Sequence, residues 1–583
     1  MLARVSSYLL SGIDALACEV EVDFDDTTAS DTPKGVVVGL PDAGVKESIE
    51  RVKAAVVNSG YAYPRGRLLI NLAPADVRKE GPIYDLPIAL GLLMVQGVIE
   101  DPALRRFKAG GGTKVVTKVN RTPGGAVSVS KMREAVGKPT DEVGGGEGDE
   151  LSRAFDEAMA LGEVHGAGDE PAAEELIDLR RYLVAGELAL DGRVRPVKGV
   201  IAMATLARQL GLAGVIVPRE NAAEAAVVPG VEAIGVSSLV EAVGMLSGRV
   251  GVNVQAPTDV AALLRTASAE IDFADVRGQE SVKRAIVVAA AGGHNIIMLG
   301  PAGTGKSMMA KALPGVLPAM TAEEAIEVTR VYSAAGKMEG GQGVVTVRPV
   351  RTPHHTASGA AVIGGGMIPR PGEVSLAHRG VLFLDELPEF PRDVLETLRQ
   401  PLEDHVVTIA RSHSAVKFPA SFMLVAAMNP TPKGDMPSDE GGRRAMERYL
   451  AKLSGPLVDR IDIHVEAPAV PFKQLSGRDG PRGTSSAQMR EQVLAARRKQ
   501  IARQGEGKVN ARLSGRELDR LAPMTDAARS ILEQAMTELK LSARAYDKIR
   551  RVSRTIADLE GAETIDVAHV SEAVQYRLLD RRL

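Results

Sequence analysis

A glycine-rich turn between an apolar run and a helical segment constrains this chain more than any other feature. Residues 295–307 read NIIMLGPAGTGKS. The apolar run predicts a buried strand leading into a tight turn, whose backbone N–H groups can wrap a phosphate because glycine leaves no Cβ in the way. A helix beginning at about Lys306 adds a positive N-terminal dipole. The segment therefore predicts a phosphate-binding loop, and a chance glycine-rich turn is the alternative.

The loop and a second motif together predict an ATPase site. The expected nucleotide-binding residues are Gly300, Pro301, Ala302, Gly303, Thr304, Gly305, Lys306 and Ser307. Lys306 can reach the β- and γ-phosphates, and the Ser307 hydroxyl can bind Mg²⁺. Residues 381–386, VLFLDE, predict a strand followed by two carboxylates. Asp385 would help to hold Mg²⁺ and Glu386 would polarise the attacking water, so we expect ATP and Mg²⁺ as cofactors.

The composition limits the partners and the compartment. The net charge of −3 gives no global attraction to DNA, and the 3% of aromatic residues argue against a stacking platform for single strands. The single cysteine, Cys18, excludes an intramolecular disulfide framework and is expected to be a buried filler. No apolar run reaches the length of a membrane span, and the first residues do not have the pattern of a signal peptide. We expect a cytoplasmic protein without a membrane contact.

Changes in sequence character divide the 583 residues into several parts. Residues 1–250 alternate strand and helix patterns, which indicates an α/β domain, with an interruption at about 102–180. Within the interruption, residues 105–138 carry nine Lys/Arg against one Glu, and residues 141–179 carry thirteen Asp/Glu against one Arg. A flexible charged insertion or a basic nucleic-acid arm fits this pattern. A linker at 251–270, a nucleotide-binding core at 271–470 and a helical region at 485–583 follow.

Several long motifs, in order along the chain, resemble one family. In the core and the helical region they are GPAGTGKS, RTPHHTASGAAVIGGG, PRPGEVSLAHRGVLFLDELPEF, LRQPLEDHVVTIAR, LSGPLVDRIDIHVE and LSARAYDKIRRVSRTIADLEGA. These are similar to the magnesium-chelatase-like AAA+ ATPases of the ComM (YifB-like) type. The N-terminal GLPDAGVKESIERVKAAVVNSG, NLAPADVRKEG and GELALDGRVRPVKGV resemble the Lon-protease-like domain of that family.

The resemblance implies an α/β multidomain protein with three parts. They are a Lon-protease-like (S5-like) α/β domain, an AAA+ P-loop α/β/α core and a C-terminal helical lid of the magnesium-chelatase type. It also implies an ATP-dependent homohexameric ring with ATP sites between subunits. Asn429 would be the first sensor, Arg460 the arginine finger and Arg544 the second sensor. A neighbour's arginine would stabilise the charge that develops on the γ-phosphate and tie hydrolysis to assembly.

Two features depart from the family pattern: the charged insertion at about 102–180 and the residues that stand where relatives often carry paired cysteines. Where relatives often carry paired cysteines, this chain has Thr431 and Lys433, which cannot make a thiolate metal pair. The stretch that would hold a Lon-type nucleophile, residues 71–100, contains no serine, and Ile201 stands where the lysine is expected. We therefore expect a non-proteolytic domain. The adjacent His354 and His355 fit a loop role, such as one in the pore of the ring, better than a metal-binding pair.

The expected activity is that of a DNA motor. The resemblance implies helicase and branch-migration activity that supports integration of DNA in natural transformation. Arg411 and Lys417 flank the tip of a predicted hairpin and are candidates for gripping phosphates without reading sequence. Two alternatives stay open: a chelatase motor subunit, and a protein-remodelling ATPase whose N-terminal domain binds a protein partner.

Overall fold

A computed structural model describes most of the chain. The described residues are 2–25, 35–100, 177–366, 369–410, 415–431, 444, 446, 448–453, 455–470 and 483–577. The predicted insertion, apart from its last residues, and the candidate Arg411 lie outside them. In the part of the chain that the structure describes, no helix combines the length and the apolar character needed to cross a bilayer.

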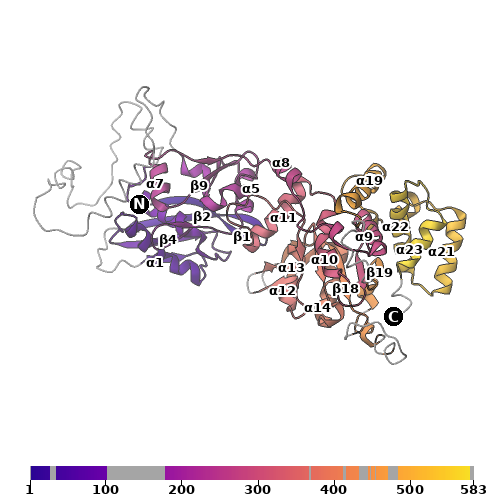
Figure 1. The fold of residues 1–583 in the computed structure, drawn as a ribbon. Helices are drawn as coiled ribbons and strands as arrows, with labels where there is room; N and C mark the ends of the chain where they lie inside the picture. Colours follow the sequence, from indigo (N-terminus) through magenta and orange to yellow (C-terminus); the bar gives the residue numbers. More distant parts are fainter. Residues whose placement is uncertain are drawn as a thin grey trace, which may run out of the picture. The chain divides into compact units, whose positions relative to one another are not determined.

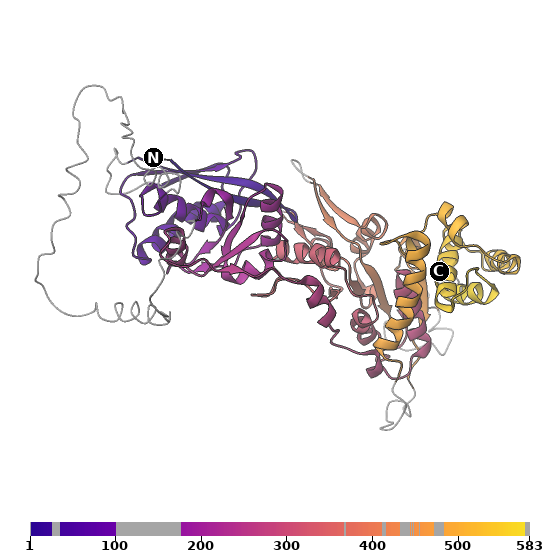
Figure 2. The same ribbon diagram turned by 90° about the horizontal axis from the view of Figure 1, so that it is seen from above.

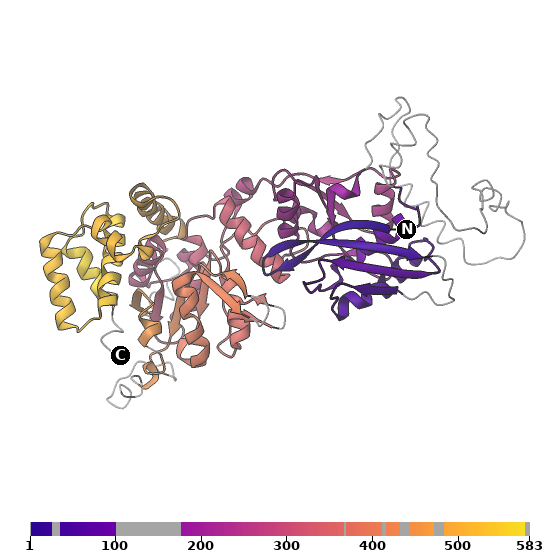
Figure 3. The same cartoon turned by 180° about the vertical axis from the view of Figure 1, so that it is seen from behind.

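The first sheet is built from the N-terminal strands (Figure 3). Its order is β1-β2-β4-β3, with β1 (Leu2–Ser11), β2 (Asp14–Asp25) and β4 (Arg67–Ala73) antiparallel and β3 (Gly35–Val38) parallel to β4. Helix α1 (Ala43–Asn58) and helix α2 (Asp85–Val95) accompany it, and α2 packs on β1 and β2. The approach is close at Gly91, where a Cβ would lie 2.7 Å from a Val22 methyl group. As expected, Cys18 is buried.

A second sheet has the order β10-β9-β8-β5. Its strands are β5 (Tyr182–Val184), β8 (Gly214–Pro218), β9 (Glu232–Val236) and β10 (Val254–Gln255). Helices α5 (Val200–Gln209), α6 (Arg219–Ala225) and α7 (Leu239–Leu246) belong to the same region. Strands β6 (Glu187–Leu188) and β7 (Val194–Arg195) form a separate antiparallel pair. Since β10 pairs with β9, the segment predicted as a linker begins with a strand of this sheet.

Helix α8 (Val260–Thr266) and helix α11 (Ala322–Ala335) pack with this second sheet's hydrophobic core. Ala325 and Val328 of α11 share a buried cluster with Met203 and Val215. The Ser333 hydroxyl of α11 also donates to the buried Glu224 carboxylate, which accepts the backbone N–H of Ile201 at 2.8 Å. A helix that follows the phosphate loop in sequence is therefore part of the packing of the N-terminal region.

The core of the nucleotide-binding region is a five-stranded parallel sheet of order β12-β15-β18-β11-β19. Its strands are β11 (Ile296–Leu299), β12 (Val350–Arg351), β15 (Val381–Leu384), β18 (Met423–Met428) and β19 (Ile463–Glu466). Side chains of β11 alternate between two hydrophobic clusters, with Ile296 and Met298 in one and Ile297 and Leu299 in the other. Both faces of the sheet are thus covered, which explains why the predicted strands read as continuous apolar runs.

Short elements surround this sheet (Figure 1). They are α9 (Glu280–Gly292), α10 (Lys306–Ala312), α12 (Gly359–Ile363), β13 (Gly364–Gly365), β14 (Arg370–Pro371), α13 (Glu373–Leu376), α14 (Arg392–Thr397), α15 (Arg399–Asp404), β16 (Val406–Ala410), β17 (Ala415–Pro419) and α17 (Gly455–Val458). Strands β16 and β17 form the antiparallel hairpin that the sequence predicts.

The C-terminal region is helical, as predicted. It comprises α19 (Ser486–Gln504), α20 (Gly515–Leu521), α21 (Asp526–Glu538), α22 (Ala543–Glu560) and α23 (Val567–Gln575). Figure 2 shows α19 alongside α9, and the two helices make extensive contacts. Thus α19 ties the helical region to the nucleotide-binding region.

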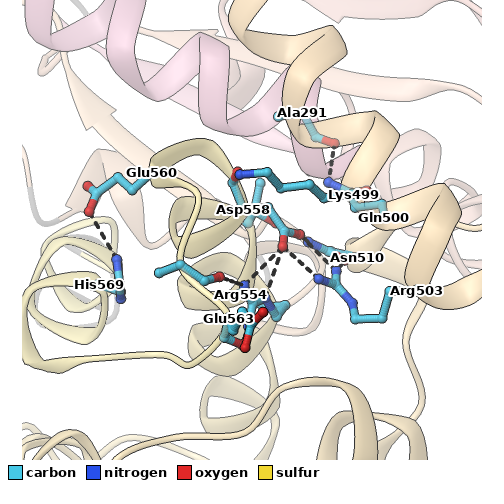
Figure 4. Close-up of polar contacts among 12 residues, drawn as sticks. Ala291, Lys499, Gln500, Arg503, Asn510, Arg554, Asp558, Glu560, Glu563 and His569 are labelled. Atoms are coloured by element: carbon cyan, nitrogen blue, oxygen red, sulfur yellow. Dashed lines mark hydrogen bonds and ion pairs between the residues drawn. The ribbon is translucent and has the colours of Figure 1, made fainter.

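A buried polar cluster holds the C-terminal helices together (Figure 4). The carboxylate of Asp558 accepts hydrogen bonds from Arg503 at 2.6 and 2.8 Å, from Asn510 at 2.8 Å and from Arg554 at 3.2 Å. Arg554 also donates to the backbone carbonyls of Ala562 and Glu563. Because each buried charge has several partners, the cluster avoids the penalty of an isolated charge and fixes α19 against α22.

Candidate nucleotide site

The phosphate loop has the strand–turn–helix geometry that the sequence predicts. Strand β11 ends at Leu299 and α10 begins at Lys306. A Cβ at Gly300 would lie 2.2 Å from the carbonyl oxygen of Ala467, so only glycine fits there. Gly303 and Gly305 have φ values of 79° and 84°, in the left-handed region that glycine adopts without strain. The loop is therefore shaped by its glycines to present backbone N–H groups at the start of a helix.

Lys306 lies inside this loop. Its Nζ donates to the carbonyl oxygens of Gly300 at 2.7 Å and Pro301 at 2.8 Å, and to Asn429 Oδ1 at 3.1 Å. Burial lowers the pKa of Lys306, and the negative charge of Asp385 opposes that shift. Asn429 directly follows β18. Its side chain therefore meets the Lys306 ammonium and the loop at one place, where a nucleotide phosphate can be held.

Ser307 and Asp385 meet beside the lysine. Ser307 Oγ donates to Asp385 Oδ2 at 2.6 Å, and Asp385 Oδ1 accepts the backbone N–H of Glu386 at 3.0 Å. A hydroxyl and a carboxylate at this separation fit Mg²⁺, which prefers oxygen ligands and is usually held by one or two side chains together with substrate phosphates. No cluster of three or more His, Cys, Asp or Glu suited to a metal occurs among the described residues.

Glu386 carries a contact that sequence reasoning missed. It is the second residue after β15 and has φ of 53°, a left-handed conformation that is uncommon outside glycine and often marks functional sites. Its Oε2 lies 3.2 Å from Nδ1 of His355, whose ring centroid is 4.2 Å from that of His354. The imidazole therefore holds the carboxylate predicted to act on water. Adjacent histidines were visible in the sequence, but no local signal connected them to a residue 31 positions later.

Gln279 is a second residue that the sequence analysis did not single out. Its Nε2 donates to Pro468 O at 2.7 Å and lies 3.4 Å from Thr304 O in the phosphate loop. Its Oε1 is buried and has no hydrogen-bond partner among the described residues. A buried acceptor next to the loop can receive an N–H of the nucleotide base.

Arg460 and Arg544 lie together at the opposite edge of the sheet from the loop. Arg460 Nη1 donates to Pro456 O at 2.6 Å and its Nη2 pairs with Glu403, whereas Arg544 is 3.7 Å from Asp459. Both line a cavity of about 530 Å³ that also includes Asn295, the residue immediately before β11. The phosphate loop follows β11 at its other end, so the two predicted arginines are separated from the chain's own loop by the length of that strand.

A buried cluster of ion pairs and hydrogen bonds holds the segment that carries Arg460. Lys548 Nζ of α22 is 2.8 Å from Asp462 Oδ1, and His294 Nδ1 is 3.3 Å from Asp462 Oδ2. Although burial acts to raise it, the pKa of Asp462 is held below its usual range by Lys548 and His294. The side chain of Asn295 adds a link, donating to Arg460 O at 3.0 Å and accepting from the Leu424 N–H at 2.9 Å.

Two other predicted positions lie outside these clusters. Lys417 is exposed on β17 of the hairpin, and its predicted companion Arg411 lies outside the described residues. Ile201, at the position expected for a Lon-type lysine, is fully buried in α5. Lys417 is thus available to a large ligand, while the Ile201 position offers no base for nucleophilic catalysis.

The geometry of the parallel sheet, the glycine-rich loop and the Ser307–Asp385 pair is that of a P-loop nucleotide site in a core of the AAA+ class. Three family models match the chain. The model for magnesium chelatase, subunit ChlI, matches residues 272–475, its C-terminal model matches 483–577, and the model for subunit ChlI of Mg-chelatase matches 20–134 and 148–221.

Similar proteins cover the same length. The chain is 37% identical to Competence protein ComM of Haemophilus influenzae, with 100% of this chain and 98% of that protein aligned. It is 36% identical to Uncharacterized protein YifB of Escherichia coli, over 98% and 96% of the two chains. The Magnesium-chelatase 38 kDa subunit of Cereibacter sphaeroides is 26% identical over 33% of this chain. The protein belongs to the ComM/YifB family of magnesium-chelatase-related AAA+ proteins.

Proposed function

We propose that this protein is an ATP-driven homohexameric motor that moves on DNA and supports recombination of incoming DNA. The observation that supports a ring is that the predicted catalytic residues lie at two opposite edges of one parallel sheet. The phosphate loop, Asp385, Glu386 and Asn429 gather at one edge, and Arg460 and Arg544 at the other.

This division favours completion of each site by a second copy. Strand β11 has four residues, which span about 13 Å at the usual rise of a strand. Arginines beyond its start are poorly placed to neutralise a phosphate beyond its end. A head-to-tail contact, repeated until the ring closes, would bring the arginine edge of one subunit to the loop of the next. Arg544 would then serve the neighbour's nucleotide together with Arg460.

The roles of the residues follow from their chemistry. Mg²⁺, held by Ser307 and Asp385, would neutralise the β- and γ-phosphates. Lys306 would bind the same phosphates, Glu386 would orient and polarise the attacking water, and Asn429 would hold that water or the γ-phosphate. Arg460 and Arg544 of the adjacent subunit would stabilise the charge that develops in the transition state.

DNA as the substrate rests on the family resemblance. The relative from Haemophilus influenzae is named a competence protein and aligns with the whole chain. The exposed Lys417 on the β16–β17 hairpin supplies a cation that can hold a phosphate without base contacts. The Lon-protease-like domain would assist assembly or DNA handling, since neither a serine nucleophile nor a lysine base is found at the expected positions.

A chelatase motor subunit is the weaker candidate. The similarity to the 38 kDa magnesium-chelatase subunit is confined to 33% of this chain, whereas the similarity to ComM extends over all of it. A protein-remodelling ATPase would differ from both in being stimulated by a protein partner.

The ring arrangement can be tested with two complementary variants. Arg460→Ala removes the proposed finger and keeps the subunit's own loop, while Glu386→Gln removes the water-orienting group and keeps the finger. Each pure variant should bind ATP but hydrolyse it at least about 100-fold more slowly than the wild type. A mixture should regain ATPase activity, because the Glu386→Gln subunits supply an intact Arg460 to the intact loops of neighbouring Arg460→Ala subunits. If rings shown to contain both variants regain no ATPase activity, the proposal that two subunits share each ATP site is refuted.

A further inference from the structure

The cavity that contains Arg460 and Arg544 has more positive charge than its own carboxylates can pair. We call it the arginine cavity. Its charged residues are Arg460, Arg512, Arg544, Lys548, Arg551, Glu403, Asp459, Asp462 and Asp547, with His405 beside them. It measures about 530 Å³, within the range of small-molecule sites.

Three of the cations have carboxylate partners. Arg460 pairs with Glu403, Arg544 lies 3.7 Å from Asp459, and Lys548 lies 2.8 Å from Asp462. The other two, Arg512 and Arg551, form no ion pair with a carboxylate among the described residues, and Asp547 forms none with a cation there.

The guanidinium of Arg551 makes one hydrogen bond, through Nε, to the described part of the chain. Its Nε donates to Leu513 O at 2.8 Å, and neither terminal nitrogen bonds a group in the described part of the chain. On α22, Arg544, Lys548 and Arg551 are spaced i, i+4 and i+7, so they share one face of the helix, and all three line the cavity. The helix therefore presents a row of three cations.

Arg512 approaches the same cavity from the segment before α20. Its Nη2 donates to Ser421 Oγ at 2.5 Å. Burial and the neighbouring Arg379 lower the pKa of Arg512, and burial together with Arg512 and Arg379 lowers the pKa of His405 to about 4. These cations repel one another, and an anion in the cavity would relieve that repulsion.

We propose that Arg551 and Arg512 bind the phosphates of the nucleotide held by a neighbouring copy of this chain, alongside Arg460 and Arg544. The inference rests on the proposed ring and extends it, because the receiving edge then supplies four arginines rather than two. A nucleoside triphosphate matches the cavity by charge, and guanidinium groups bind phosphate oxygens through two parallel hydrogen bonds. The five cations of the cavity outnumber its four carboxylates by one, and among these carboxylates Asp547 is the one without an ion pair to a described residue.

Steady-state ATPase measurements on the full chain test this assignment. Arg551→Gln and Arg512→Gln should each lower kcat/KM for ATP about 10- to 100-fold, the loss expected for one hydrogen bond between charged groups. Arg529→Gln is the matched control. It removes the same charge from an exposed residue of α21 that pairs with Asp526 away from the cavity, and its activity should stay within about twofold of the wild type.

Mixing separates a phosphate contact from a structural role. Arg551→Gln mixed with Glu386→Gln should regain ATPase activity, because the Glu386→Gln subunits supply intact arginines to the active loops of Arg551→Gln subunits. A misfolded Arg551→Gln chain would not be rescued. Binding of a fluorescent ATP analogue to dilute Arg551→Gln monomers should match the wild type, since their own loop is intact.

The result that overturns the inference differs from the result that overturns the ring. Wild-type kcat/KM in Arg551→Gln and Arg512→Gln, together with a large loss in Arg460→Ala, refutes the inference and leaves the ring standing. Wild-type kcat/KM in Arg460→Ala refutes the ring and the inference with it. A loss in Arg551→Gln that mixing does not restore assigns the residue to its own subunit and also overturns the inference.

Discussion

Replacing Lys548 by methionine should destabilise the contact between the helical region and the nucleotide-binding core. Lys548 Nζ lies 2.8 Å from Asp462 Oδ1, and both side chains are only 10% exposed. At an effective dielectric constant of about 20, the two charges attract by about 6 kcal/mol, part of which offsets the cost of removing both charges from water.

The loss in the free energy of unfolding depends on which partners of Asp462 remain in Lys548→Met. Removing one partner of a buried pair costs about 3–5 kcal/mol because the other charge is left uncompensated. In Lys548→Met, Asp462 Oδ2 still has His294 Nδ1 at 3.3 Å and the Asn295 N–H at 3.3 Å, whereas Oδ1 loses its ion-pair partner. We therefore expect the lower end, a loss of about 3 kcal/mol in the free energy of unfolding.

A double-mutant cycle measured by urea denaturation and far-UV circular dichroism tests this reasoning. Asp462→Asn combined with Lys548→Met removes both charges, so the double variant should be more stable than Lys548→Met alone. The coupling free energy should exceed about 1 kcal/mol. A loss below about 1 kcal/mol in Lys548→Met, or a double variant less stable than Lys548→Met, would refute the argument.

Three further predictions concern pH, magnesium and the water-orienting carboxylate. The pKa of His405 is lowered to about 4 by burial, Arg512 and Arg379, so its stabilising contribution is complete above pH 6.5 and is lost as the pH falls from 6.5 to 4. His405→Asn should therefore be less sensitive to acid in that window, by about 1 kcal/mol after allowing for its partial exposure. Ser307→Ala should raise the Mg²⁺ concentration for half-maximal ATPase activity about tenfold, because the hydroxyl is a proposed ligand. His355→Ala should lower kcat about tenfold with little change in KM, because His355 contacts Glu386, the residue proposed to act on the attacking water.

Each of these predictions has an outcome that contradicts it. An unchanged acid-unfolding profile of His405→Asn between pH 6.5 and 4 would exclude His405 as the titrating group. An unaltered magnesium dependence of Ser307→Ala would remove the hydroxyl from the ligand set. For His355, a rise in KM with unchanged kcat would assign the histidine to nucleotide binding, and Thr356→Ala serves as the control in the same loop.

The local parts of the site could be predicted from the sequence because each is carried by one continuous stretch. The apolar run Ile296–Leu299, the glycines of the loop and the start of α10 at Lys306 are adjacent in the chain. The same holds for β15 and Asp385, which directly follows it, and the meeting of Asp385 with Ser307 follows from the parallel order of β11, β18 and β15.

The remaining features depend on residues that tertiary packing brings together. Asp462 meets Lys548, 86 positions later, only because α22 packs against the start of β19. The shared cavity of Arg460 and Arg544 has the same origin. Likewise, the sequence placed α11 within the nucleotide-binding region but gave no sign that Ser333 would bond to Glu224. Helical periodicity indicates which face of α11 is apolar and does not identify the surface that covers it.

The most direct test of the central claim is the ATPase rate with and without forked or four-way DNA, measured for the wild type and Glu386→Gln. DNA should accelerate wild-type turnover, with an effect that weakens as salt rises, and Glu386→Gln should assemble with ATP but not hydrolyse it. Wild-type turnover that ignores every DNA structure at both low and moderate salt would contradict a DNA motor and direct attention to a protein partner of residues 1–250.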